Sequence, residues 1–263
     1  MAERLDKYLV SHGFAKSRER AKQLIQNGEV CINGIPAAKA SDEVGENDTV
    51  TAGEDLKYVG RGALKLLKAV EVFGLELGGL VCADLGASTG GFTQVMLEQG
   101  ASKVYAVDVG HGQLDERLAS DSRVVNMEGV NVRELTLSDF EEPPQFISAD
   151  LSFISLRAVA PVIAELTSDN GSAAVLIKPQ FEAGRAALGK NGIVKDPKDH
   201  IRVITELDAA FRLEGLYINK LTWSPVKGGS GNTEYLALLT KQPPAALPDI
   251  QQTVREAFSN LRK

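Results

Sequence analysis

The chain has 263 residues, which is long for one ordinary domain and short for two full ones, and its 43% hydrophobic and 24% charged residues are usual for a globular protein. No apolar run approaches the roughly 20 residues of a membrane span, and the first residues lack the apolar core of a signal peptide. The formal net charge of -6 argues against a nucleic-acid partner unless basic residues are concentrated in one part of the chain.

The first 50 residues predict a small module of two helices and a hairpin. Residues 5–10 have the apolar spacing of a short helix, and Ser17 is a suitable N-cap for a second helix that ends near Gly28. The pair Asn33-Gly34 lies between two short apolar runs and favours a hairpin turn. Residues 16–22 carry four basic side chains and one acidic side chain. By charge alone, this run suits a solvated helix face as well as an RNA-binding face.

The order of these residues favours the second alternative. Residues 4–9, 17–21 and 28–34 together resemble the small RNA-binding domain named after ribosomal protein S-four, over about residues 3–50. Cationic side chains would neutralise phosphates there, and the absence of aromatic stacking residues favours recognition of RNA shape and backbone over bases. The resemblance implies that RNA is faced by Arg4, Ser17, Arg18, Arg20 and Lys22, and we add Arg61 in the segment that follows the module.

A short stretch of mixed polarity, residues 51–58, is the predicted linker. We therefore expect an RNA-binding domain with its linker at 1–57 and a second domain at 58–263.

From residue 80 onward the pattern alternates between strand and helix. A helix is predicted at 63–73, before this alternation begins. The predicted strands are 81–85, 103–109, 123–127, 146–150, 172–178, 217–224 and 233–240, and the predicted helices between and after them are 92–99, 157–166, 197–212 and 249–261. Alternating units of this kind predict an α/β fold with a mostly parallel sheet, helices on both faces and a ligand at the carboxyl ends of the strands.

Residues 81–92 look like the ligand loop of that fold. A buried strand carries Asp84 near its end, and a glycine-rich turn leads into a helix, where the backbone can approach a ligand closely. Ser88 stands where a dinucleotide fingerprint has its second glycine, so a smaller ligand without a pyrophosphate is favoured. Asp108 ends the next strand, where a carboxylate accepts hydrogen bonds from ribose hydroxyls. Both NAD and S-adenosylmethionine contain a ribose, and the missing glycine favours S-adenosylmethionine.

Asn131, after the third strand, lies either near an adenine or in a simple turn. The predicted cofactor-binding residues are Asp84, Gly86, Ala87, Ser88, Thr89, Gly90, Gly91, Phe92, Asp108 and Asn131.

Five separated motifs strengthen this interpretation. Residues 58–66, 84–93, 150–156, 176–182 and 231–236 resemble, in this order, motifs of the FtsJ-type ribose methyltransferases, over about residues 57–242. Together with the N-terminal module they resemble the TlyA family, whose members were once labelled hemolysins. The resemblance implies a Rossmann-like, seven-stranded S-adenosylmethionine-dependent methyltransferase fold with an antiparallel last strand. It also implies 2′-O-methylation of cytidine in ribosomal RNA, with ribosomal RNA or ribosomal subunits as partners. The implied catalytic set is Lys65, Asp150, Lys178 and Glu234.

The chemistry expected of this set is to hold a ribose hydroxyl in line with an activated methyl group and to accommodate its proton. A free lysine has a pKa near 10.4, so Lys178 could serve as a base only if burial or Lys65 lowered its pKa, whereas Asp150 and Glu234 act in the opposite direction. Whether Lys178 removes the proton or stabilises negative charge on the oxygen is left open.

The competing functions are a membrane-active hemolysin and an RNA-binding protein without catalysis. No long apolar segment or strongly basic amphipathic helix supports the first, and the complete catalytic set argues against the second. Two cysteines in different predicted domains and three isolated histidines predict a reduced, cytoplasmic protein without a metal site. The oligomeric state is not predicted.

Overall fold

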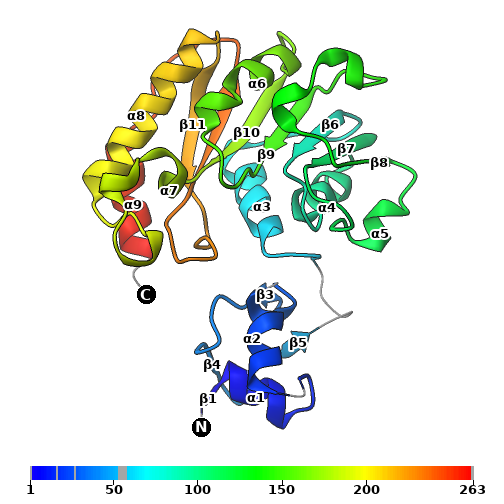
Figure 1. Cartoon of the computed structure of the whole chain (residues 1–263), viewed down its shortest axis with the longest axis vertical. Coiled ribbons are helices and arrows are strands. Elements are labelled where there is room, and N and C mark those ends of the chain that lie inside the picture. The colour runs from blue at the N-terminus through cyan, green and yellow to red at the C-terminus, as the bar shows by residue number, and fades with distance from the viewer. Residues whose placement is uncertain (1, 16, 27, 53–57, 262–263) are drawn as a thin grey trace. The chain divides into compact units, whose positions relative to one another are not determined.

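The computed structural model describes residues 2–15, 17–26, 28–52 and 58–261, in two compact units, Met1–Ala63 and Leu64–Lys263 (Figure 1). Lys16 of the predicted basic run and residues 53–57 of the predicted linker lie outside the described residues.

The N-terminal unit consists of two helices and two small antiparallel sheets. Strand β1 pairs with β4, and the other sheet has the order β3-β2-β5. Asn33 and Gly34 have φ values of 54° and 76°, so the predicted Asn-Gly turn joins β2 to β3. The elements are β1(Glu3–Arg4), α1(Leu5–Ser11), α2(Arg18–Gln26), β2(Val30–Ile32), β3(Ile35–Pro36), β4(Glu43–Val44) and β5(Val50–Ala52). Its core includes Leu5, Leu9, Ala21, Ile25 and Val30.

The larger unit contains a seven-stranded sheet in the order β11-β12-β10-β9-β6-β7-β8. Its strands are β6(Val81–Leu85), β7(Lys103–Asp108), β8(Val124–Glu128), β9(Phe146–Ala149), β10(Ser172–Ile177), β11(Tyr217–Trp223) and β12(Tyr235–Thr240). Its α-helices, with α3 taken here although it begins at the end of the N-terminal unit, are α3(Gly62–Phe73), α4(Gly91–Glu98), α5(Glu116–Ala119), α6(Ala160–Leu166), α7(Pro179–Glu182), α8(Pro197–Leu213) and α9(Ile250–Asn260). Short 3-10 helices are η2(Val132–Glu134), η3(Leu137–Asp139), η4(Leu156–Ala158), η5(Arg185–Ala187) and η6(Lys190–Gly192).

The direction of the strands agrees with the predicted methyltransferase topology. Strands β8, β7, β6, β9 and β10 are parallel, and β12 runs antiparallel between β10 and β11. The last strand in the sequence is therefore an inner strand of the sheet, and the predicted seven-stranded fold with an antiparallel last strand is confirmed.

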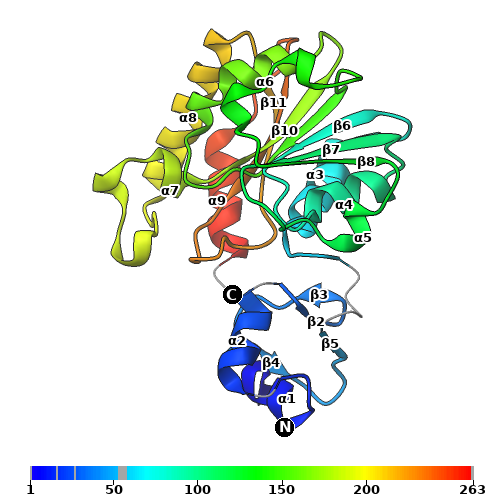
Figure 2. The ribbon, with the colours of Figure 1, turned by 45° about the vertical axis from the view of Figure 1, so that its right-hand side comes forward.

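Burial on both faces of the sheet explains why the central strand has a mostly apolar sequence. All five residues of β6 are buried, because this central strand has neighbours on both edges and helices on both faces. Figure 2 shows α8 and α9 on one side of the sheet and α3 and α4 on the other. One core joins Ile163 of α6, Phe211 of α8 and Val254 of α9 to the sheet face that contains Ala83 and Val107.

Aspartate side chains cap the first turns of α8 and α9. Asp196 accepts a hydrogen bond from the backbone N–H of Lys198 at the start of α8, and Pro197 occupies the first position of this helix. Asp249 caps α9 through the backbone N–H of Gln252. These caps fix the helices that support the carboxyl edge of the sheet.

Candidate functional site

Four charged side chains meet at the carboxyl edge of the sheet. Asp150 and Lys178 directly follow β9 and β10, Glu234 directly precedes β12, and Lys65 comes from the first turn of α3. Lys65 Nζ lies 2.9 Å from Glu234 Oε2 and 3.2 Å from Asp150 Oδ2. Lys178 Nζ lies 2.6 Å from Asp150 Oδ1. The charges therefore alternate in one chain of contacts, Glu234, Lys65, Asp150 and Lys178, and their formal sum is zero.

The site is almost dry. The side chains of Lys65, Lys178 and Glu234 are 11%, 9% and 2% exposed, and that of Asp150 is 19% exposed. Burial alone would lower the pKa of Lys65, but Asp150 and Glu234 outweigh it and raise this pKa. Burial alone would raise the pKa of Asp150, but the two lysines outweigh it and lower this pKa. Both groups are therefore ionised at neutral pH.

Lys178 differs from Lys65 in the hydrogen-bond donors that its ammonium group has left for a substrate. Its ammonium group donates to Ser152 Oγ at 2.8 Å as well as pairing with Asp150. Because an ammonium group has three N–H donors, one is left for a further acceptor. Lys65, in contrast, lies between two carboxylates and has the more strongly anionic surroundings. Sequence reasoning did not assign Ser152, although it directly follows the Asp150-Leu151 pair.

Glu234 is held by its neighbours. Gln180 Nε2 donates to Glu234 Oε1 at 3.4 Å, and a Cβ on Gly228 would collide with the same oxygen. Gln180 Oε1 is buried and has no hydrogen-bond partner in the part of the chain that the structure describes.

The loop after β9 presents an aromatic ring beside the charges. Phe153 is 91% exposed, and its φ of 63° is a left-handed conformation that is costly for an aromatic residue. Its ring lies 5.2 Å from that of Phe181, and Lys178 Nζ lies 5.9 Å from the Phe181 ring. Glu182 fixes the rest of the loop by accepting from Ser155 Oγ and the Leu156 N–H. The loop is thus fastened on one side and exposes Phe153 on the other.

The predicted glycine loop lies against this site. Gly86 has φ 85°, and a Cβ there would lie 2.8 Å from the carbonyl oxygen of Asp150. Only glycine allows this close approach, so the loop and the residue after β9 share one wall. Ser88 also has a positive φ, 48°, and its N–H donates to Asp108 Oδ2 at 2.8 Å. Asp108 Oδ1 accepts from the Gly110 N–H at 2.8 Å.

The carboxylate of Asp108 keeps acceptor capacity after these two bonds, because each oxygen has a second lone pair. The next turn is shaped by Glu128, which accepts from the N–H groups of Gly112, Gln113 and Leu114. These backbone hydrogen bonds lower the pKa of Glu128 to about 2. Sequence reasoning did not find Glu128, because its partners lie in another loop.

The remaining residues of the glycine loop differ in their exposure to solvent. Ser88 and Thr89 are exposed, whereas Ala87, Gly90, Gly91 and Phe92 are buried. A Cβ on Gly90, whose φ is 95°, would collide with Leu118 of the α5 turn. Gly90 therefore serves packing at the start of α4.

Two predicted cofactor residues have local partners. Asp84 is fully buried and accepts from Thr93 Oγ1 at 2.7 Å and from Ser148 Oγ at 2.9 Å. Burial raises the pKa of Asp84 to about 6, although both hydroxyl groups lower it. Asn131 caps η2 by accepting from the Arg133 N–H, and it donates to Glu134 Oε1. Asn131 thus has a role in the local turn, and its position near an adenine stays a prediction.

In the N-terminal unit, the buried carboxylate of Asp6 organises two predicted RNA-binding residues. Arg4 Nε lies 3.1 Å from Asp6 Oδ1, and Arg18 Nη2 lies 2.5 Å from Asp6 Oδ2. The arginine side chains are 45% and 48% exposed, so both remain reachable from solvent. Ser17 caps α2 by accepting from the Arg20 N–H. The guanidinium of Arg18 is thereby fixed at the start of a capped helix.

Among the other basic residues, Arg20 and Lys22 are exposed, and Arg61 donates to the carbonyl oxygen of Ala38 at 3.4 Å. The expectation that this module lacks stacking aromatic residues is wrong. The ring of Tyr8 stacks on His12 at 3.8 Å and on Phe14 at 6.5 Å. Phe14 is 39% exposed.

The sheet order, the glycine loop after β6 and the carboxylate at the end of β7 place the larger unit in the class of S-adenosylmethionine-dependent methyltransferase folds. Residues 58–241 match the FtsJ-like methyltransferase family, and residues 3–50 match the S4 domain. The chain belongs to the FtsJ-like methyltransferases that carry an N-terminal S4 domain.

Relatives of this kind cover nearly the whole chain. It is 42% identical to YqxC of Bacillus subtilis, a suspected rRNA methyltransferase, over 99% of this chain and 96% of the relative. It is 40% identical to TlyA of Mycobacterium tuberculosis, a 16S/23S rRNA (cytidine-2′-O)-methyltransferase, over 97% of each chain. A solved structure of a suspected hemolysin from Streptococcus thermophilus is 39% identical and has a TM-score of 0.77, over 99% of this chain and 97% of that one.

Because some relatives are named hemolysins, it matters whether any described helix could cross a membrane. Across residues 2–15, 17–26, 28–52 and 58–261, none of the helices combines the length and the apolar character that crossing a bilayer demands.

Proposed function

We propose that this chain transfers the methyl group of S-adenosylmethionine to the 2′-oxygen of a cytidine ribose in ribosomal RNA. The observation that carries the proposal is the buried, alternating chain of Glu234, Lys65, Asp150 and Lys178 beside the glycine loop. Relatives that share 40% identity over nearly the full length are named for this reaction. The N-terminal S4 domain supports an RNA substrate, and exposed guanidinium groups at Arg4 and Arg18 would contact its phosphates.

The loop after β6 and the last residue of β7 fit S-adenosylmethionine. Gly86 lets the loop approach the Asp150 carbonyl closely, and Asp108 keeps acceptor capacity for ribose hydroxyls. Gly86, Ala87 and Ser88 would border the cofactor, with Asp108 on its ribose. Asp84 would act from below, by fixing Thr93 and Ser148 under the loop. When bound, S-adenosylmethionine supplies a methyl carbon that its sulfonium already activates.

The chain's residues then have to align the ribose oxygen and accommodate its proton. The third N–H of Lys178 donates to the 2′-oxygen, and its positive charge stabilises the negative charge that grows there. Asp150 holds Lys178 in position, and Lys65 holds Asp150. In this scheme Lys178 acts as a charge stabiliser. As the oxygen–methyl bond forms, the bond from the methyl carbon to the donor's sulfur breaks and the hydroxyl proton passes to solvent water.

Phe153 extends the site toward the base. Its exposed ring lies beside that of Phe181, which in turn is 5.9 Å from Lys178 Nζ, and an unstacked base of the target nucleotide would lie against it. Aromatic stacking of this kind stabilises splayed RNA bases.

The experiment combines cofactor binding with product mapping. Purified protein is incubated with methyl-labelled S-adenosylmethionine and ribosomal subunits that lack the modification, and 2′-O-methylcytidine is mapped in the RNA. We expect Lys178→Ala to bind S-adenosylmethionine as the wild type does, measured by calorimetry. Its methyl-transfer rate should be about 10²–10³-fold lower than that of the wild type. Lys198→Ala, which removes an exposed lysine of α8, is the matched control.

Three results would contradict the proposal. Full transfer by Lys178→Ala would remove this residue from catalysis. RNA binding without cofactor binding by the wild type would indicate a non-catalytic RNA-binding protein. Leakage of liposomes caused by the pure protein, without any RNA methylation, would favour the membrane-active alternative.

A further inference from the structure

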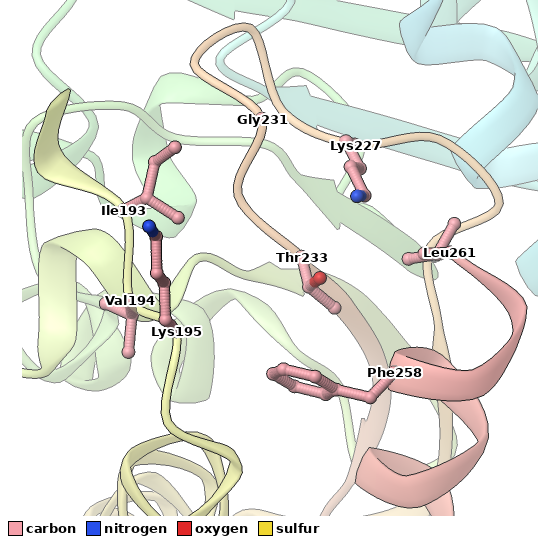
Figure 3. A pocket seen from close by; sticks show the side chains of 8 residues that line it. All are labelled: Ile193, Val194, Lys195, Lys227, Gly231, Thr233, Phe258 and Leu261. Carbon is pink, nitrogen blue, oxygen red and sulfur yellow. The ribbon is translucent and has the colours of Figure 1, made fainter. Parts of the chain in front are cut away.

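A pocket lies beside the start of β12 and is bordered by Thr233, the residue before Glu234. It has a volume of about 350 Å³, within the range of small-ligand sites. Figure 3 shows Lys195 along one wall and Lys227 entering from the opposite loop, with Thr233 and the ring of Phe258 below them. The pocket thus combines two cations, a hydroxyl group and an aromatic face.

The two loops that carry these lysines are fastened to each other. Asn232 is 1% exposed, and its Oδ1 accepts from the Val194 N–H at 3.0 Å while its Nδ2 donates to the Gly192 carbonyl at 3.0 Å. The Gly228 N–H donates to the Asn232 carbonyl at 2.9 Å. The side chain and the backbone of one buried residue therefore set the separation of both walls.

The floor is equally fixed. His200 is fully buried, and its Nε2 lies 3.0 Å from the carbonyl oxygen of Val194, which can only accept. Nε2 therefore carries the proton, and Nδ1 accepts from the Tyr235 hydroxyl at 2.9 Å. The Phe258 ring packs edge-on against His200, with centroids 5.0 Å apart. The shape of the pocket exists before any ligand enters.

The charges in this pocket lack internal compensation. Within residues 58–261, neither Lys195 nor Lys227 forms an ion pair with a carboxylate. The nearby Asp196 accepts from the Lys198 N–H, and Asp199 pairs with Arg202. Lys195 is exposed and Lys227 is half-buried, so both can meet an anion from solvent.

We propose that this pocket binds one nucleotide of the RNA strand next to the target nucleotide, with its phosphate between Lys195 and Lys227 and its base against Phe258. The proposal rests on the proposed function. An RNA strand fits because phosphate matches the two lysines and a base matches the aromatic floor. Its position also fits, because Thr233 borders the pocket and Glu234, the next residue, belongs to the catalytic set. RNA that contacts the catalytic set at Glu234 is therefore next to the pocket, because Thr233 and Glu234 are consecutive residues.

The test uses the full-length protein with Lys195→Ala, Lys227→Ala and the double variant, and Lys198→Ala as the matched control. Ribosomal subunits without the modification serve as the probe, both in methyl transfer and in direct binding at several salt concentrations. A single phosphate contact contributes about fivefold to affinity at ~0.15 M salt, so each single variant should raise the KM for RNA by about fivefold. The slope of log affinity against log salt should fall by about 0.7–0.9 for each lysine removed. The kcat, the affinity for S-adenosylmethionine and the melting temperature should stay as in the wild type.

The outcomes separate this proposal from the function on which it rests. A double variant with the wild-type KM and salt slope overturns the pocket assignment and leaves the methyltransferase proposal intact. Equal losses in Lys198→Ala also overturn it, because the effect would then be one of general charge. If the wild type binds RNA but transfers no methyl group, the proposed function fails and direct binding alone decides the pocket. If it binds no RNA, both proposals fail.

Discussion

Replacing Lys65 by methionine removes the cation that lies between Asp150 and Glu234. The formal charge of the four-residue set changes from zero to -1, because one lysine then faces two carboxylates. Glu234 cannot be rehydrated easily, since its side chain is only 2% exposed. Removal of one partner from a buried ion pair costs about 3–5 kcal/mol. Because Asp150 keeps Lys178 at 2.6 Å, we expect the lower end, about 3 kcal/mol of unfolding free energy.

The double variant Lys65→Met/Glu234→Gln sharpens this prediction. It restores a neutral set of one lysine and one carboxylate, so about 2 kcal/mol of the lost stability should return. Methyl transfer should stay at least ~10²-fold below the wild type in both variants, because the positioning contacts are still absent. Urea unfolding followed by circular dichroism gives the stabilities, and labelled-methyl incorporation into ribosomal subunits gives the activities. A Lys65→Met protein as stable as the wild type, or a double variant less stable than the single one, would refute the view that these charges compensate each other.

Three further changes test other parts of the structure. Burial raises the pKa of Asp84 from an ordinary 3.8 to about 6, so the folded protein favours the protonated carboxyl and its unfolding free energy falls by up to about 3 kcal/mol as the pH rises from about 4 to about 6. Asp84→Asn should lack this decline when unfolding is measured at both ends of the range. An unchanged pH profile in the variant would contradict the assignment. Arg18→Ala should weaken RNA binding about fivefold at ~0.15 M salt, measured by fluorescence anisotropy, because a solvent-facing guanidinium that Asp6 holds in place is lost. Glu19→Ala is the control, and an equal loss of RNA affinity in this variant would argue against a specific contact by Arg18. Phe153→Ala should raise the KM for RNA about 5- to 100-fold with an unchanged melting temperature, because the ring is 91% exposed and has stacking as its proposed role; a lower melting temperature would instead indicate a structural role.

Much of the fold was predictable because its signals are local. The continuous burial of β6 follows from its apolar residues, and the glycines after it mark the turn. The caps of α8 and α9 are set by single aspartates within three residues of their partners. The set of Lys65, Asp150, Lys178 and Glu234 was indicated by resemblance, since these four residues are far apart in the sequence.

What could not be predicted depends on contacts between distant segments. The sequence predicts Asp84 as a cofactor-binding residue, but it does not reveal the hydrogen bonds that Thr93 and Ser148 donate to this carboxylate in the core. Ser152 acquires its role only when β10 brings Lys178 beside it. The stacking of Tyr8 on two other rings likewise depends on how the chain turns after α1, which spacing alone does not reveal.

The position of β12 has a consequence for synthesis of the protein. This strand comes after residue 230 in the sequence, yet it fills the gap between β10 and β11 and starts directly after Glu234. A nascent chain that has not yet emerged to this point leaves the edges of both neighbouring strands without their partner. It also lacks the last carboxylate beside Lys65. Completion of the sheet and completion of the catalytic set therefore occur in the same late folding event, and a chain that ends early acquires neither.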